Sequence, residues 1–115
     1  MSVTIWHNPR CSKSRQTLAL LTERGIEPTI VEYLKTPPPT ADLQETLGKL
    51  NLAPRDLMRR KEAPYAEQGL DDTGLSDEAL VQAMHDNPVL IERPVVLANG
   101  KAAIGRPPEQ VLDIL

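Results

Sequence analysis

The segment PVVLANGKAAIG, residues 94–105, constrains the fold more than any other part of the chain. Two short apolar runs flank Asn99-Gly100. Asn-Gly is the dipeptide that a two-residue type I′ turn prefers, because both turn residues take a positive φ. The segment therefore predicts an antiparallel hairpin. A chain with this hairpin contains a β-sheet, and its other elements have to be arranged around that sheet.

Strand and helix patterns alternate in the first third of the chain. Residues 3–6 (VTIW) are mostly β-branched or aromatic and predict a first strand. Residues 12–24 favour a helix, and Gly25 stands where a C-terminal cap belongs. Residues 29–34 (TIVEYL) predict a second strand, which ends before the three consecutive prolines at 37–39.

A helical region separates this second strand from the hairpin. Thr40 is placed to cap a helix whose leucines recur at helical spacing, and a short helical piece is expected around residues 55–60. Ser76, followed by two acidic residues, predicts the start of another helix, which ends at Asn87-Pro88. Pro107 is expected to begin a last short helix.

The predicted order of elements defines a fold class. Two strands joined by a right-handed helical crossover are parallel, and the hairpin adds two antiparallel strands. We therefore predict an α/β fold of the thioredoxin-like (glutaredoxin-like) plan, with a mixed four-stranded sheet flanked by helices and an inserted helical region. With 115 residues the chain has the length of one domain, so we expect a single thioredoxin-like domain over residues 1–115.

The composition argues against several function classes. The net charge of −3 and an aromatic content of 3% do not favour nucleic-acid binding. The sequence contains neither a signal-peptide pattern nor an apolar run of membrane-spanning length, so we expect a cytoplasmic protein with no membrane partner. One cysteine and two histidines make a poor set of zinc ligands, and we expect no metal and no bound cofactor.

The only cysteine, Cys11, is the strongest candidate for chemistry. It lies in HNPRCSKSR, residues 7–15, among three cations and at the predicted start of a helix. The unpaired N–H groups and positive dipole of a helix N-terminus, together with nearby cations, favour the thiolate over the thiol. The pattern predicts a nucleophile, whereas the alternative is an inert packing thiol.

The spacing around Cys11 excludes two common thiol motifs. A CxxC redox pair needs a cysteine where Ser14 stands, and a C-x5-R phosphatase loop needs an arginine where Thr17 stands. A papain-type site would have to use His85, which is the only distant histidine. What remains is a single-thiol nucleophile whose resolving thiol comes from another molecule. Ser14 is one helical turn on, where its hydroxyl can donate to the sulfur, and His7 either tunes this loop or makes only local hydrogen bonds.

Three arginines in proline-rich contexts are candidate anion ligands. Arg59, Arg93 and Arg106 each stand near a proline at an expected element boundary. The guanidinium fork suits tetrahedral oxyanions, although a single arginine is more often a solvated surface residue. Thioredoxin-like folds have a cis proline that faces the reactive cysteine at the start of the third strand. By that analogy we expect a cis Arg93–Pro94 bond.

These segments also carry a resemblance to a known family. HNPRCSKSR, followed in order by RRKEAPY, RPVVL and GRPPEQVLDIL, resembles the glutaredoxin-dependent arsenate reductases, and the likeness extends from about Val3 to Leu115. It implies the thioredoxin-like fold with its inserted helical region, and reduction of arsenate to arsenite. The implied site residues are Cys11 as nucleophile, Ser14 as support for the thiolate, His7 at the start of the loop, and Arg59, Arg93 and Arg106 on the oxyanion.

The resemblance also implies partners and a covalent mechanism. Cys11 would attack arsenic, and the adduct would be resolved by glutathione as co-substrate and by glutaredoxin, with no bound cofactor. Arg60 is a close rival of Arg59 for the first arginine position. Counting back from Pro64 favours Arg59. Ser12-Lys13 follows the cysteine, where the best-known enzymes of the family have Gly-Thr.

Two other readings of the chain stay open. The first is a general glutathione-linked thiol–disulfide oxidoreductase of the same fold, in which the three arginines would be dispensable. The second is a transcription regulator resembling the Spx-type proteins, which typically carry a CxxC switch that Ser14 interrupts here. A monothiol glutaredoxin with an iron–sulfur cluster fits less well, because its loop has Gly-Phe between the cysteine and the serine.

Overall fold

The structure, a computed structural model, describes residues 2–115, and the chain divides into two compact units. The first, which we call the sheet unit, comprises the residues up to Thr36 together with Arg93–Leu115. The second, the helical unit, is Pro37–Glu92. The helical unit is inserted between the second and third strands of the sheet unit, which confirms the predicted inserted helical region.

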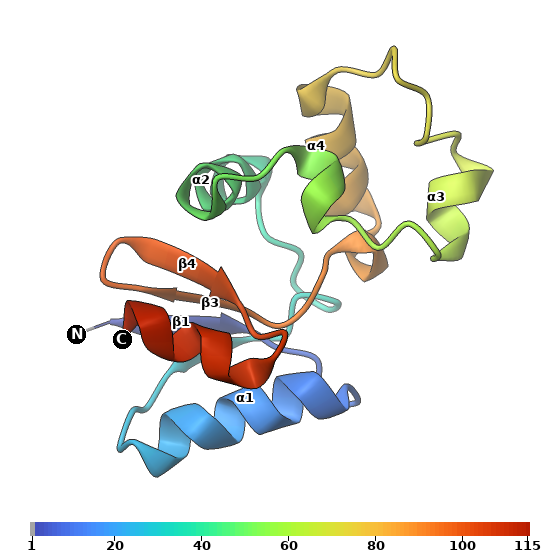
Figure 1. Cartoon of the computed structure of the whole chain (residues 1–115). Helices are drawn as coiled ribbons and strands as arrows, with labels where there is room; N and C mark the ends of the chain where they lie inside the picture. Colours follow the sequence, from blue (N-terminus) through green and yellow to red (C-terminus); the bar gives the residue numbers. More distant parts are fainter. Residues whose placement is uncertain (1) are drawn as a thin grey trace. The chain divides into compact units, whose positions relative to one another are not determined.

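The sheet unit contains a mixed four-stranded sheet, as predicted (Figure 1). Its strands are β1 (Val3–Trp6), β2 (Thr29–Val31), β3 (Val95–Ala98) and β4 (Lys101–Ile104), in the order β2-β1-β3-β4. Strand β1 pairs in parallel with β2 and antiparallel with β3, and β3 pairs antiparallel with β4. This is the thioredoxin-like arrangement that the order of elements predicted.

Strand β2 is shorter than the sequence predicted. It ends at Val31, because the carbonyl oxygen of Glu32 accepts hydrogen bonds from the backbone N–H groups of Lys35 and Thr36, each at 2.9 Å. These bonds close a turn where the apolar pattern of residues 29–34 suggested a continuing strand. The turn therefore begins directly after the strand that lies beside β1.

One face of the sheet is covered by two helices of the same unit. Helix α1 (Ser12–Glu23) and the 3-10 helix η3 (Pro108–Ile114) pack together against this face. Their buried side chains and those of β1 and β3 form an aliphatic core: Val3, Ile5, Leu21, Val96, Ala98, Val111 and Ile114. The alternation of β1 and the register Val3↔Ala98, Ile5↔Val96 place these strand residues on one face.

The hairpin and helix-end predictions are confirmed. Asn99 and Gly100 have φ values of 56° and 74°, the left-handed pair that a type I′ turn requires. The Asn99 side-chain amide donates to the carbonyl oxygen of Ile114 at 2.9 Å, which ties the turn to the end of η3. Gly25, with φ of 76°, follows the C-cap Arg24 of α1.

The helical unit contains α2 (Thr40–Leu50), η1 (Pro54–Leu57), α3 (Ala63–Glu67), α4 (Asp77–Asp86) and η2 (Pro88–Leu90). Ser76 caps α4 as predicted, because its Oγ accepts from the N–H of Ala79 at 3.2 Å. Thr40 was expected to be a cap, but it is the first residue of α2, and the N-cap is Pro39.

The short helices η1 and α3 differ from what the sequence predicted. The piece expected at residues 55–60 is the 3-10 helix η1, and α3 was not anticipated, since only five residues form it. Within residues 2–115, no helix is both long enough and apolar enough to cross a membrane.

The residue after β4, Gly105, is packed too closely for a side chain. A Cβ atom there would lie 2.5 Å from Thr17 Oγ1 and 2.8 Å from Pro94 Cγ. Both neighbours are constrained, Pro94 by its ring and Thr17 by a 2.8 Å hydrogen bond from its Oγ1 to the carbonyl oxygen of Lys13 in α1.

We therefore expect Gly105→Ala to destabilise the protein by about 1–3 kcal/mol, the usual cost of overpacking. Gly48→Ala is the matched control, because a Cβ at Gly48 meets nothing within 4 Å in α2. The control should be neutral or more stable by about 0.5–1 kcal/mol, since alanine favours a helix interior. Urea unfolding measures both, and equal effects of the two variants would contradict the close packing.

Candidate active site

Cys11 is the N-cap residue of α1, with φ −94° and ψ 123°. Its backbone is held on both sides, because its N–H donates to the carbonyl oxygen of Asn8 and its own carbonyl accepts from the N–H of Arg15, each at 3.0 Å. The residue is half-buried rather than sealed in the core. The thiol thus lies where the first, unpaired N–H groups of a helix point.

Ser14 and His7 are joined beneath this loop. Ser14 Oγ is fully buried, lies 2.6 Å from His7 Nδ1, and accepts from the backbone N–H of Asn8 at 3.0 Å. A buried hydroxyl without partners would cost free energy, so these bonds fix the loop to the first turn of α1. The two predicted residues are therefore in direct contact with each other.

The proton on His7 decides what the Ser14 hydroxyl can do. If Nδ1 carries the proton, His7 and Asn8 both donate to Ser14 Oγ, and the Ser14 proton is available for another acceptor such as the Cys11 sulfur. If Nδ1 is bare, it takes the Ser14 proton instead. The tautomer of His7 consequently decides whether the Ser14 proton is held by His7 or is available to another acceptor.

Arg106 reaches the cysteine from the end of the chain. Its Nη2 lies 3.8 Å from Cys11 Sγ, and its Nε donates to the carbonyl oxygen of Arg93 at 2.8 Å. The Arg93–Pro94 bond is cis, as predicted, and Arg106–Pro107 is a second cis bond that the sequence did not indicate. Arg93 is half-buried, and it belongs with Arg106 and Cys11 to the sheet unit.

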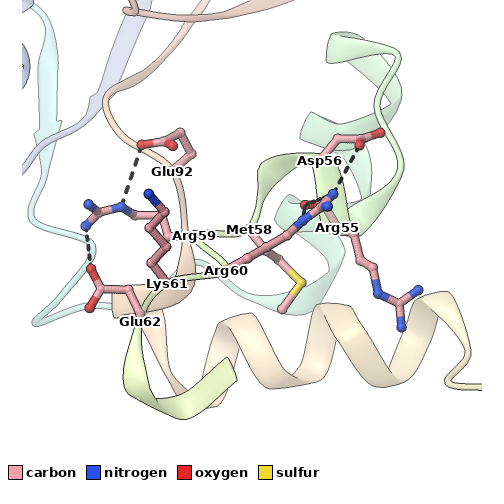
Figure 2. Close-up of a pocket in the computed structure, with 8 residues that line it drawn as sticks. All are labelled: Arg55, Asp56, Met58, Arg59, Arg60, Lys61, Glu62 and Glu92. Carbon is pink, nitrogen blue, oxygen red and sulfur yellow. Dashed lines mark hydrogen bonds and ion pairs between the residues drawn. The ribbon is translucent and has the colours of Figure 1, made fainter. Parts of the chain in front are cut away.

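The third predicted arginine, Arg59, belongs to the helical unit. Figure 2 shows its guanidinium between two carboxylates: Nη1 lies 2.8 Å from Glu62 Oε1, and Nε lies 3.8 Å from Glu92 Oε1. The Arg59 backbone N–H donates to the carbonyl oxygen of Leu90 at 2.7 Å. Arg59, Glu62 and Glu92 are among the residues that line a pocket of about 460 Å³ within the helical unit.

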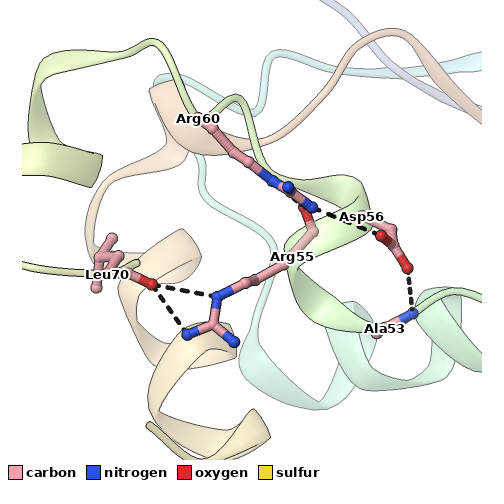
Figure 3. A network of polar contacts seen from close by, with 5 residues as sticks. All are labelled: Ala53, Arg55, Asp56, Arg60 and Leu70. Atoms are coloured by element: carbon pink, nitrogen blue, oxygen red, sulfur yellow. Dashed lines mark hydrogen bonds and ion pairs between the residues drawn. The ribbon is translucent and has the colours of Figure 1, made fainter. Parts of the chain in front are cut away.

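The rival Arg60 has a different environment (Figure 3). Its side chain is 55% exposed, against 29% for Arg59, and its Nη2 lies 3.6 Å from Asp56 Oδ1. Its Nε and Nη2 also donate to the carbonyl oxygen of Arg55, at 3.4 and 3.3 Å. Arg60 is thus bound to the turn of η1, whereas Arg59 is the better enclosed of the two.

Arg55, which the sequence did not single out, has a structural role. Its guanidinium donates to the carbonyl oxygen of Leu70 from Nε and Nη2, at 3.3 and 3.1 Å, and also to that of Asp72. The partners of Arg59 were missed as well. The i,i+3 spacing of Arg59 and Glu62 is the signal that indicates that pair, but nothing local indicates Glu92.

Within residues 2–115, no group of three or more His, Cys, Asp or Glu side chains is arranged to hold a metal ion. The sheet unit does bring together a half-buried thiol and a guanidinium 3.8 Å from its sulfur, and it also holds the buried Ser14–His7 pair. On a thioredoxin-like fold, these residues form a candidate active site around one cysteine.

Comparisons with known proteins give the family. The model of the ArsC family matches residues 6–114. The uncharacterised protein YfgD of Escherichia coli strain K12 is 60% identical over 98% of this chain and 96% of its own length. The arsenate reductase of Neisseria meningitidis serogroup A is 53% identical over 98% of this chain and 97% of its own.

A solved structure agrees with these relatives. The arsenate reductase from Vibrio cholerae superposes with a TM-score of 0.97 at 54% identity, covering 100% of this chain and 98% of that chain. The chain belongs to the ArsC family.

Burial lowers the pKa of His7 below its ordinary value of 6.5, while the charge of Glu32 raises the pKa and that of Arg15 lowers it. The unfolded chain therefore binds a proton near pH 6.5 that the folded protein binds only at lower pH. The contribution of neutral His7 to the free energy of unfolding is therefore fully present above about pH 6.5. It is lost as the pH falls toward the lower pKa of His7 in the folded protein.

We expect an NMR titration of the His7 imidazole, assigned with His7→Gln, to have its midpoint below 6.5. Glu32→Gln should move the midpoint lower still, because it removes the charge that raises the pKa. His7→Gln should also lose less stability than wild type between pH 7.5 and 5.5. A midpoint above 6.5, or an upward shift in Glu32→Gln, would contradict the proposed causes.

Proposed function

We propose that this protein is an arsenate reductase, which reduces arsenate to arsenite through a covalent Cys11–arsenic intermediate resolved by glutathione and glutaredoxin. The observation that carries the proposal is the 3.8 Å contact between Arg106 Nη2 and Cys11 Sγ, a guanidinium directly on the only thiol. The names of the relatives at 53–54% identity support the same substrate.

In the first step the Cys11 thiolate attacks arsenic(V). A sulfur–arsenic bond forms, an arsenic–oxygen bond breaks, and the oxygen leaves as water after protonation, so arsenic stays pentavalent. Arg93 and Arg106 bind the oxyanion and stabilise the charge that develops on its remaining oxygens. When the sulfur is anionic, the Ser14 hydroxyl donates a hydrogen bond to it. This requires the His7 tautomer with the proton on Nδ1, because only then is the Ser14 proton not bound to His7.

In the second step glutathione supplies the thiol that this chain lacks. Its sulfur replaces a second oxygen on arsenic, and another water leaves. The glutaredoxin thiolate then attacks the glutathione sulfur, forming a glutaredoxin–glutathione disulfide. The electron pair of the broken sulfur–arsenic bond passes to arsenic, which becomes trivalent. Water cleaves the remaining Cys11–arsenic bond, so that arsenite leaves and the thiol is regenerated.

Arg59 is the proposed third ligand of the oxyanion, in preference to Arg60. Its lower exposure and its two carboxylate partners give its guanidinium a defined position. Glu62 and Glu92 act as positioning residues in this proposal, whereas Arg60 serves the turn of η1.

The proposed reaction uses no resident metal or cofactor, because glutathione enters as a co-substrate. It belongs in the cytoplasm, where thiols are kept reduced. The main alternative is a general thiol–disulfide oxidoreductase acting on glutathionylated partners. The partial exposure of Cys11 is equally consistent with this alternative function. Only the dependence of the activity on the three arginines distinguishes it from arsenate reduction.

Cys11→Ser should abolish arsenite production, because serine is a far weaker nucleophile than a thiolate. The measurement is a coupled arsenate-reduction assay with glutathione and glutaredoxin, alongside mass spectrometry of the arsenic adduct. Urea unfolding of the variant should match wild type, since the half-buried Cys11 is not a core residue. Appreciable turnover by the serine variant would refute the nucleophile assignment.

Arg93→Ala and Arg106→Ala should each lower kcat/KM for arsenate at least about 10-fold, as expected for a lost charge-assisted contact. Arg59→Gln should do the same, and Arg60→Gln is its matched control, expected to change kcat/KM less than about two-fold. Unchanged kinetics in all three site variants would favour the general oxidoreductase. A larger loss of kcat/KM in Arg60→Gln than in Arg59→Gln would make Arg60, rather than Arg59, the third ligand of the oxyanion.

A further inference from the structure

A second pocket lies in the sheet unit beside the cysteine loop, residues 7–11, and of its lining residues the proposed steps at arsenic use only His7. It has a volume of about 210 Å³ and is lined by residues 7–10 of the loop and by Glu32, Leu34 and Lys35. The two walls meet because β1 and β2 are parallel neighbours whose carboxyl ends share one edge of the sheet. The N–H of His7 donates to the carbonyl oxygen of Val31 at 2.8 Å, which joins the walls at their base.

The charges of this pocket have a definite pattern. Arg10 and Lys35 bring two cations, and Glu32 brings one carboxylate. Lys35 Nζ lies 3.6 Å from Glu32 Oε1, and the two side chains are 79% and 42% exposed. Leu34 adds an apolar side chain that is itself 42% exposed. A ligand with two anionic groups and one cationic group would match these charges.

The loop side of the pocket is well held. The Arg10 backbone N–H donates to Asn8 Oδ1 at 3.0 Å, and Arg15 Nη1 donates to the carbonyl oxygen of Pro9 at 3.0 Å. Arg10 is also the residue directly before Cys11. A ligand bound to Arg10 would therefore contact the same loop that carries Cys11, and the backbone of this loop is held by these hydrogen bonds.

We propose that this pocket binds the glutathione that resolves the arsenic adduct, an inference that rests on the proposed function. Glutathione carries two carboxylates and one ammonium group. Its γ-glutamyl end, with a carboxylate and the ammonium, suits Lys35 and Glu32, and its glycine carboxylate suits Arg10. The pocket is smaller than the roughly 300–1,000 Å³ of clefts that enclose a drug-sized ligand. In this proposal the pocket binds the charged ends of glutathione and leaves its central cysteine outside the pocket, available for reaction with the arsenic adduct.

Direct binding tests the site without any arsenic chemistry. The intact protein is titrated with S-methylglutathione, whose blocked sulfur forms no disulfide, and backbone amide shifts are followed by NMR. We expect saturable shifts at Arg10, Glu32 and Lys35, weakened by sodium chloride because exposed charges are screened. Shifts confined to other residues, or no saturable shifts, would overturn the proposal.

Kinetics test it with a matched pair of double variants. Arg10→Gln with Lys35→Gln should raise the KM for glutathione about three- to ten-fold, as expected for two exposed charge pairs, and leave the KM for arsenate unchanged. The control, Arg24→Gln with Lys101→Gln, removes the same charge from two exposed residues outside the pocket and should change neither constant. An equal rise in both double variants would mean a general charge effect and overturn the site.

The two proposals fail in different ways. Saturable binding of S-methylglutathione at this pocket by a protein that does not reduce arsenate would retain the site and refute the proposed function. Arsenate reduction with an unchanged KM for glutathione in Arg10→Gln with Lys35→Gln would retain the function and refute the site. A rise in the KM for glutaredoxin alone would assign the pocket to the partner protein and also refute it.

Discussion

The buried hydroxyl of Ser14 is the contact on which the geometry of the cysteine loop depends. It joins His7 and Asn8, the two residues that follow β1, to the first turn of α1, at 2.6 and 3.0 Å. Because a buried hydroxyl is costly when unpaired, the loop has one conformation in which both ends are satisfied. That conformation leaves Cys11 half-buried at the helix N-terminus. The same hydroxyl contacts the ring of His7, whose pKa is lowered by burial.

The sulfur of Cys11 is contacted by a residue from the other end of the chain. Arg106 and Cys11 are 95 positions apart, yet the guanidinium contacts Sγ while its Nε holds the carbonyl of Arg93. Gly105 allows this, because the chain there passes within contact distance of Thr17 and Pro94. The close packing of Gly105 on Thr17 of α1 and on Pro94 thus lies directly before Arg106, the residue whose guanidinium contacts Sγ.

Much of the fold was predictable because its signals are local. The Asn99-Gly100 turn, the Ser76 cap and the glycine after α1 each act through the backbone preferences of a few residues. The errors were also local: β2 ended early where the carbonyl of Glu32 closes a turn, and the five-residue α3 lacked a periodic pattern. The predictions of fold class and strand order were still correct, because they depend on the longer elements and on the hairpin.

For the site, composition and motif were sufficient to select Cys11, since a lone thiol among cations at a helix start is distinctive in any fold. They also indicated Arg59, Arg93 and Arg106 as candidate anion ligands, which stays a prediction. Only the folded chain decided which atoms meet: Nη2 of Arg106 on the sulfur, Nδ1 of His7 on Ser14, and Glu92 beside Arg59. Such contacts join residues far apart in sequence through side-chain packing across several elements. No pattern confined to a few neighbouring residues carries that information.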